Sequence, residues 1–203
     1  MALIKDFPKF GSGIVGSTTL PPAYYVYDAY NTALENNGAQ NDLGSLGVLA
    51  VCNQFSLSNG RGTTLVGRYV RYNSTANPAL LAAPGPVYWK DETFTTVTGV
   101  STESVGGVNM VAGLMLINTT TVSGLTAATL NGNFVWIAVA GFVPGVTSIG
   151  VTYAAGDAMI GAATNFTVGK VAAGTAPTNQ VIGYAASATS SSLVDILMTM
   201  PLY

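Results

Sequence analysis

The stretch that decides the fold class reads Gly132-Asn133-Phe134-Val135-Trp136-Ile137-Ala138-Val139-Ala140-Gly141. Apart from Asn133, the residues between the flanking glycines are apolar, and none of them is charged or a proline. A short apolar run that is bounded by turn residues is typical of a buried strand. Trp136 stands in the middle of the run, and we expect its large side chain to anchor the core.

Similar short runs recur on both sides of this stretch, from about residue 61 onward. Glycine, asparagine and proline separate these runs at short intervals, and no stretch as long as about twelve residues keeps a helical periodicity. The chain is therefore predicted to be all-β: a β-barrel or β-sandwich of many short strands, with at most one or two short helices and an extended N-terminal arm. The expected strands are Thr64–Tyr72, Val87–Trp89, Phe94–Val97, Val108–Ile117, Phe134–Val139, Ala158–Ile160, Phe166–Val171, Val181–Ala185 and Leu193–Met198.

A faint repeat runs through the β region, residues 61–203. Gly85-Pro86-Val87-Tyr88-Trp89 and Gly156-Asp157-Ala158-Met159-Ile160 each lead into a Thr-rich run. An apolar segment with an embedded glycine, Gly113 or Gly183, then follows each of them. This order indicates two related β lobes, although Thr-rich hairpins also resemble one another by composition alone.

Residues 1–60 differ from this region, and we expect an N-terminal arm with a short helical and loop segment. Asp28 is a suitable N-cap for the helix, and Gly38 lies near its expected end. The aromatic residues of the arm suit an interface, because tyrosine combines an apolar body with a polar tip. Packing onto the chain's own domain is the open alternative.

Two arginines of one expected strand, Arg68 and Arg71, lie on opposite faces, and we expect ion pairing across an interface. The predicted interface residues are Phe7, Phe10, Tyr24, Tyr25, Tyr27, Arg68 and Arg71.

Charged residues are scarce, at 8% of the 203 residues against roughly 25% in an ordinary globular protein. A compact monomer of 20.7 kDa exposes roughly 9,000 Å² of surface. The 7 basic and 9 acidic residues would then stand at about one charge per 550 Å². Neutral polar residues supply part of the solvation, and contacts with other subunits would account for the rest. We therefore expect a homo-oligomer or a larger assembly.

The charge balance and the first residues argue against nucleic acid and membrane as partners. A net charge of -2 and a pI of about 4.8 argue against a nucleic-acid binder. The first residues lack the pattern of a signal peptide, and no stretch approaches the roughly 20 apolar residues of a membrane span. We expect a protein that is made in the cytoplasm and is not inserted in a membrane.

The chain has no histidine and a single cysteine, Cys52. The commonest general base and the commonest zinc ligand are therefore missing. We predict no enzyme activity, no catalytic residues, no metal and no cofactor. The acidic pair Asp91-Glu92 is expected at a hairpin tip, and Asp157 in a turn. Residues 11–16 match G-x-G-x-x-G, but a proline pair follows where a dinucleotide site needs a helix.

The order of motifs between residues 132 and 198 resembles small head proteins of tailed bacteriophages, above all capsid decoration (cement) proteins. The tryptophan strand between glycine turns, the turn Ala154-Ala155-Gly156-Asp157, and the closing runs 182–185 and 194–198 carry this resemblance. Val135 and Ala138 depart from the pattern, where glycine and glutamine are usual. The resemblance implies a structural protein on the capsid surface of a virion, with the major capsid protein and copies of itself as partners.

Two alternatives stay open at this point. The first is another virion component, such as a head-fibre base or a tail protein. The second is a carbohydrate-binding module, for which Tyr88, Trp89, Asp91 and Glu92 are the local candidates, because sugar sites combine exposed aromatic residues with carboxylates.

Overall fold

The computed structural model describes residues 49–55, 62–76, 84–115, 127–132, 134–177 and 179–199. Only the backbone is described at positions 49–55, 62–65, 69, 127, 129, 134 and 136. The described strands are β1 (Leu49–Phe55), β2 (Gly62–Tyr72), β3 (Gly85–Trp89), β4 (Thr96–Thr98), β5 (Val111–Met115), β6 (Phe134–Thr147), β7 (Ala158–Gly161), β8 (Val168–Lys170), β9 (Val181–Ala185) and β10 (Leu193–Thr199). The described helices are η2 (Ser101–Glu103), η3 (Gly107–Asn109) and α2 (Ala127–Leu130). The all-β prediction is confirmed, since no helix within these ranges exceeds 4 residues.

The strands form one 10-stranded sheet in the order β1-β2-β4-β3-β5-β6-β10-β9-β7-β8, and its end strands β1 and β8 do not pair with each other in the described ranges. An additional pairing joins β2 to β6. Because of it, β2, β4, β3, β5 and β6 pair in a ring, which we call the first lobe. Within the ring, β2 runs antiparallel to β6 and parallel to β4.

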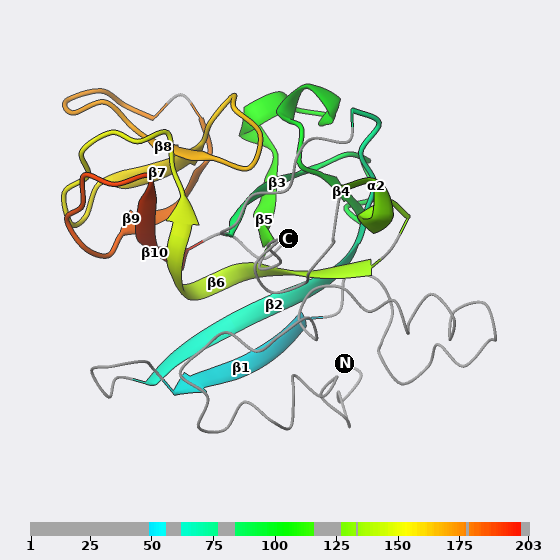
Figure 1. Ribbon diagram of the computed structural model, residues 1–203, viewed down its shortest axis with the longest axis horizontal. Coiled ribbons are helices and arrows are strands. Elements are labelled where there is room, and N and C mark those ends of the chain that lie inside the picture. The colour runs from blue at the N-terminus through cyan, green and yellow to red at the C-terminus, as the bar shows by residue number, and fades with distance from the viewer. Residues whose placement is uncertain are drawn as a thin grey trace.

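Strand β6 is 14 residues long and serves two lobes. Its second half pairs with β10, and β9, β7 and β8 follow in order. Ser148, directly after β6, forms a parallel bridge with Val168 in β8. These strands are the second lobe. Figure 1 shows β6 running below β3, β4 and β5 and then bending upward toward β7–β10, with β1 beside β2.

The two lobes repeat one pairing scheme. β3 lies between β4 and β5 as β7 lies between β8 and β9, and all four pairings are antiparallel. The register shifts after Val87 in the first lobe and after Met159 in the second. Phe94 and Phe166, which precede β4 and β8, both have φ 55°, although this left-handed region rarely holds a bulky residue. The strand pairing thus repeats where the sequence repeats its order of motifs.

The embedded glycines also have equivalent places. A Cβ added to Gly113 in β5 would collide with the carbonyl oxygen of Ala138 on β6. A Cβ added to Gly183 in β9 would collide with the carbonyl oxygen of Leu197 on β10. Each glycine therefore lets the next strand of its lobe approach closely.

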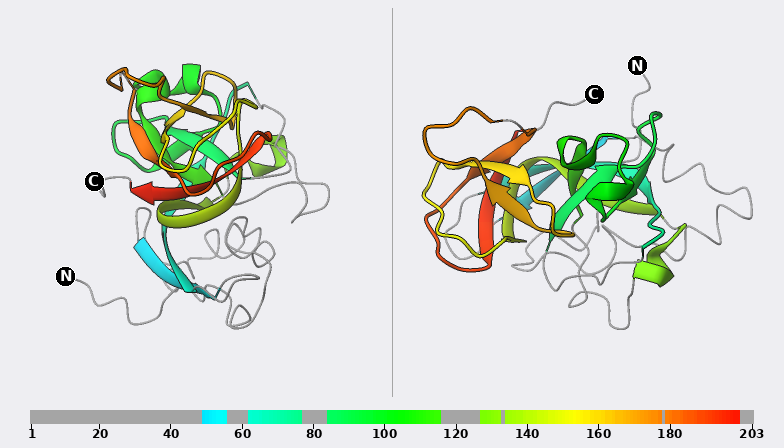
Figure 2. Two further views of the ribbon diagram at one scale, coloured as in Figure 1. Left: turned by 90° about the vertical axis from the view of Figure 1, so that its left-hand side faces the viewer. Right: turned by 90° about the horizontal axis from the view of Figure 1, so that it is seen from above.

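The lobes are joined by side chains that cross between them. Phe166 of the second lobe packs against Gly85 and Gly99 of the first, so closely that a Cβ on either glycine would overlap it. In the other direction, the Tyr88 hydroxyl donates a hydrogen bond of 2.8 Å to the carbonyl oxygen of Ala162. One continuous hydrophobic cluster runs through both lobes as a result. The compact body that these contacts hold together is seen from two further sides in Figure 2.

The strand boundaries match the expectations most closely in the second lobe, where Val181–Ala185 is found as expected. Strand β6 continues well beyond the expected Val139, as far as Thr147. Phe94, expected to begin a strand, lies in the turn before β4. The sheet also includes β1, which lies within the segment 1–60 that the sequence assigned to arm and loops. The expected helix after Asp28 lies outside the described residues.

Candidate interaction surface

The outer face of the second lobe carries a row of apolar residues across four strands. Leu197 on β10 is paired with Phe142 on β6 and with Tyr184 on β9, and Tyr184 is paired with Ala158 on β7. Residues directly opposite one another on neighbouring strands share a face of the sheet. Leu197 is 49% exposed and Tyr184 is 45% exposed. We call Phe142, Leu197, Tyr184 and Ala158 the apolar row.

Strand β10 extends this face on one side. Its burial alternates along the strand, so that Leu193 and Asp195 lie on the same face as Leu197. Leu193 is 44% exposed. The Asp195 carboxylate accepts a hydrogen bond of 2.9 Å from the Gly145 N–H, which turns its charge toward the bulge of β6. The opposite face of β10 is buried in the core and consists of Val194, Ile196 and Met198.

At the other edge of the second lobe, Asp157 organises a turn, as predicted. Its carboxylate accepts the Ala154 N–H at 2.9 Å and forms an ion pair with Lys170 at 2.9 Å. These two contacts, with the Ala154 hydrogen bond the stronger, hold the pKa of Asp157 below its usual range. The Lys170 ammonium also lies 5.8 Å from the centre of the Tyr153 ring. Both charges are thus engaged within the chain.

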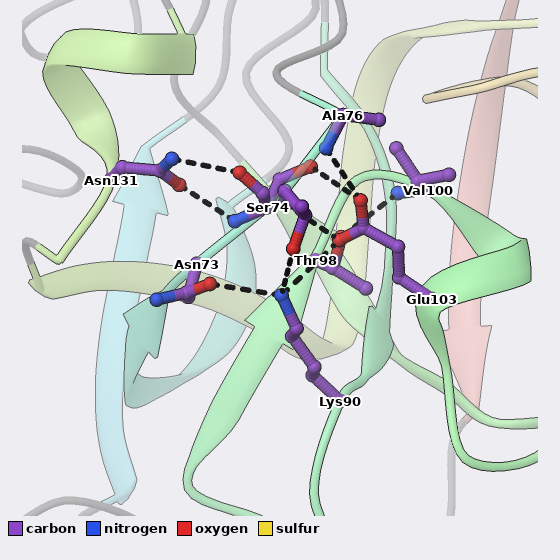
Figure 3. Close-up of polar contacts among 9 residues, drawn as sticks. Asn73, Ser74, Ala76, Lys90, Thr98, Val100, Glu103 and Asn131 are labelled. Carbon is purple, nitrogen blue, oxygen red and sulfur yellow. Dashed lines mark hydrogen bonds and ion pairs between the residues drawn. The ribbon is translucent and has the colours of Figure 1, made fainter.

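In the first lobe, Glu103 is the centre of a polar network (Figure 3). Its carboxylate accepts hydrogen bonds from the N–H groups of Ala76 at 2.6 Å and Thr75 at 3.0 Å, and from the Thr98 hydroxyl at 3.0 Å. The Lys90 ammonium lies 3.3 Å from the same carboxylate. Burial alone would raise the pKa of Glu103, but these donors outweigh it and lower the pKa.

The network fixes the chain that leaves β2. Lys90 also donates to the Asn73 side chain at 2.9 Å. On the other side, the Asn131 amide brackets the Ser74 backbone, accepting its N–H at 2.6 Å and donating to its carbonyl at 2.7 Å. As Figure 3 shows, these residues come from several parts of the first lobe. Asn73 and Ser74 follow β2, Lys90 follows β3, Glu103 lies in η2, and Asn131 lies in the turn after α2. We interpret this cluster as structural, because its donors and acceptors form hydrogen bonds with one another.

The two predicted interface arginines make contacts inside the first lobe. Arg68 donates to the Phe94 carbonyl at 3.3 Å, and its guanidinium lies 4.8 Å from the centre of the Trp89 ring. Burial lowers the pKa of Arg68. Arg71 donates through Nε to the Gly132 carbonyl at 3.2 Å. These contacts give both residues a role within the chain, and their part in an interface stays a prediction.

The candidates for a sugar site do not form one. Tyr88 is fully buried and Trp89 is 3% exposed, so neither offers an aromatic platform. The Asp91 carboxylate accepts from the N–H and the hydroxyl of Thr95, both at 3.1 Å, as a hairpin tip requires. Burial alone would raise the pKa of Asp91, but hydrogen bonds from Thr96 and Thr95 lower it. The carbohydrate-binding alternative therefore loses the two aromatic residues on which it rested, Tyr88 and Trp89.

Several predicted residues lie outside the described ranges. They are Phe7, Phe10, Tyr24, Tyr25, Tyr27 and the glycine motif at 11–16. The side chain of Trp136 is likewise not described, while its backbone pairs with Tyr69 of β2.

The apolar row was not predicted from the sequence. One signal was present, because the run Leu193-Val194-Asp195-Ile196-Leu197-Met198 carries large apolar residues on both of its faces. One face of such a strand fills the core, and the other needs a different neighbour. Phe142 and Tyr184 carry no such signal, since only the pairing of β6, β10 and β9 brings them beside Leu197.

Comparisons of this chain with protein-family models, with curated proteins and with solved structures find no match. Within the described ranges, no group of three or more His, Cys, Asp or Glu residues is placed to hold a metal ion. Of the helices in those ranges, none has the length and hydropathy to cross a membrane.

Proposed function

We propose that this protein is a structural component of a tailed-bacteriophage virion, a decoration protein that binds the outer surface of the capsid. The apolar row is the observation that carries this proposal. It places exposed Leu197 and Tyr184 opposite each other on two paired strands, and Leu193 lies on the same face of β10. Apolar patches on rigid elements are typical of surfaces that bind another protein.

The distribution of charge supports the same proposal. Ion pairs or hydrogen bonds within the chain hold Lys90, Glu103, Asp157, Lys170 and Asp195. On the outer face of the second lobe, Asp195 accepts a hydrogen bond from Gly145, and the apolar row beside it suits a surface that becomes buried in an assembly. The order of motifs between 132 and 198, which resembles that of small phage head proteins, adds the identity of the assembly.

The mechanism follows from burial. The protein would sit across junctions between capsid subunits and remove apolar surface from water, which contributes about 25 cal/mol per Å² before the costs of association. No bond is made or broken. The gain is resistance of the capsid lattice to the pressure of the packaged DNA.

The test is co-sedimentation with capsids assembled from the major capsid protein of the same genome. Wild-type protein is expected to bind, and the double variant Leu197→Ser/Tyr184→Ser is expected to lose most of the binding. Val105→Ser is the matched control, because Val105 is an exposed apolar residue of the first lobe, at 48%. Equal binding by the double variant and the wild type would exclude the apolar row as the capsid-binding surface. No binding by the wild type would refute the decoration role.

The location within the virion needs a separate measurement. A head-fibre base or a tail protein would use an apolar face of the same kind against another partner. Gold-labelled antibodies against the protein, seen by electron microscopy of virions, are expected to cover the head. Label confined to the tail or to head fibres would contradict the decoration role while leaving a structural role in place.

A further inference from the structure

Strand β1 forms one end of the sheet and has an edge that no described strand occupies. It pairs with β2 over all 7 of its residues, from Leu49↔Arg68 to Phe55↔Gly62, without a register shift. Within the described part of the chain, β2 is its only partner in the sheet. Such an edge presents a row of backbone N–H and C=O groups to a further strand.

The sequence of β1 does not protect this edge. Leu49-Ala50-Val51-Cys52-Asn53-Gln54-Phe55 contains no charged residue and no proline. Strand β8, at the other end of the sheet, has only 3 residues and ends in Lys170. Short strands, lysines, prolines and bulges are the usual means by which proteins keep an edge from pairing. Among the described strands, one end of this sheet is therefore protected against pairing, and the other lacks these protective features.

We propose that two copies of this chain pair through β1, antiparallel, about a two-fold axis at Cys52. A strand edge is self-complementary under such an axis, so each residue of one copy meets a defined residue of the other. Cys52 is the middle residue of β1, and the axis pairs all 7 positions. Leu49 of each copy then stands opposite Phe55 of the other, and Val51 opposite Asn53.

A second copy fits this edge better than an unrelated strand for two reasons. The register places Leu49 at one end of β1 opposite Phe55 at the other end, and these two apolar positions are an even number of residues apart, so they share a face of the joined sheet. In addition, β1 carries no charge that would repel its own copy. The inference does not rest on the capsid role, because it concerns the purified chain alone.

The decisive experiment compares two double variants by sedimentation velocity and equilibrium. In Val51→Lys/Asn53→Lys, the axis places two pairs of lysines opposite each other. In the matched control Val51→Lys/Asn53→Asp, it places a lysine opposite an aspartate twice, with the same number of substitutions at the same sites. Circular dichroism checks that both variants keep the β fold.

We expect the wild type to be a dimer. The dissociation constant of the lysine–lysine variant should be about tenfold or more larger, and the lysine–aspartate variant should still dimerise. A monomeric wild type, or equal dimerisation by the two variants, overturns the proposal. Loss of the dimer in both folded variants overturns the stated register. A chain that associates only with a different protein, and not with its own copies, also overturns the proposal.

A second measurement uses the unmodified chain and does not depend on variants that fold. Opposite residues of antiparallel strands have Cα atoms about 4.5–5.5 Å apart, within the range of roughly 4.4–6.8 Å that a disulfide spans. Cys52 is the chain's 1 cysteine. Copper–phenanthroline should therefore oxidise two Cys52 thiols to a disulfide, giving a covalent dimer on a non-reducing gel. A dimer in solution that yields no covalent product would place the contact elsewhere and overturn the proposal.

Discussion

Phe166 is the residue on which the union of the two lobes depends most directly. Its side chain is 2% exposed and lies against Gly85 and Gly99 of the first lobe. Replacing a buried phenylalanine by alanine typically costs about 3–5 kcal/mol, because burial is lost and a cavity is left. We expect Phe166→Ala to lower the free energy of unfolding by that amount, which is a large share of the roughly 5–15 kcal/mol of a typical domain.

Phe94→Ala is the matched control for this variant. Phe94 has the same φ of 55° and the equivalent place before its strand, but it is only half-buried, against the Trp89 ring. Any change in backbone strain is therefore the same in the two variants, and the difference between them reports burial. The measurement is urea denaturation followed by circular dichroism. A loss from Phe94→Ala as large as that from Phe166→Ala would refute the reasoning.

Gly99 supplies a second check through a double-mutant cycle. A methyl group on Gly99 would overlap the Phe166 ring, so Gly99→Ala alone should cost about 1–3 kcal/mol. In the Phe166→Ala background, the ring is gone and the methyl group fills part of the space. The two costs should therefore not add, with an interaction free energy of about 1–3 kcal/mol. Strict additivity would show that the two residues do not meet.

Three further predictions can be measured on the same protein. Hydrogen bonds hold the pKa of Glu103 below its ordinary value of 4.5, so the stability that this carboxylate contributes is complete above that pH and is lost as the pH falls through the lowered pKa. The Glu103→Gln variant should therefore have a lower free energy of unfolding at neutral pH, and its stability should change less between neutral and acidic pH. Urea midpoints measured across this pH range check the prediction, and the same pH profile in the variant and the wild type would contradict it. The Asp91→Ala variant should lose about 1 kcal/mol of stability, because the hydrogen bonds to Thr95 are lost. It should not abolish any catalytic turnover, and a reproducible activity that disappears in this variant would show that the protein is an enzyme. Deleting residues 2–20 should leave thermal unfolding near normal and weaken assembly on capsids, whereas an unfolded deletion variant would place those residues in the chain's own core.

Local patterns predicted most of the strands, because a strand needs only a short run of suitable residues between turn residues. Val181–Ala185 and Leu193–Met198 have that form, and β9 and β10 lie there. Strand β1 was missed, since Leu49–Phe55 mixes apolar and amide residues and gains its strand conformation from pairing with β2. Phe94 was predicted to begin a strand because phenylalanine favours strands, but it lies in the tight turn before β4.

The amino-acid sequence by itself determined the all-β class, the scarcity of charge, the repeated order of motifs and the absence of histidine chemistry, since these depend on composition and short-range pattern. Only the tertiary structure decided that β6 serves both lobes, that Phe166 packs into the first lobe, and that Phe142, Leu197 and Tyr184 form one surface. The physical reason is that each of these features joins residues far apart in the chain. Which strands become neighbours is decided by the burial and hydrogen bonding of the whole sheet, and no short segment carries that information.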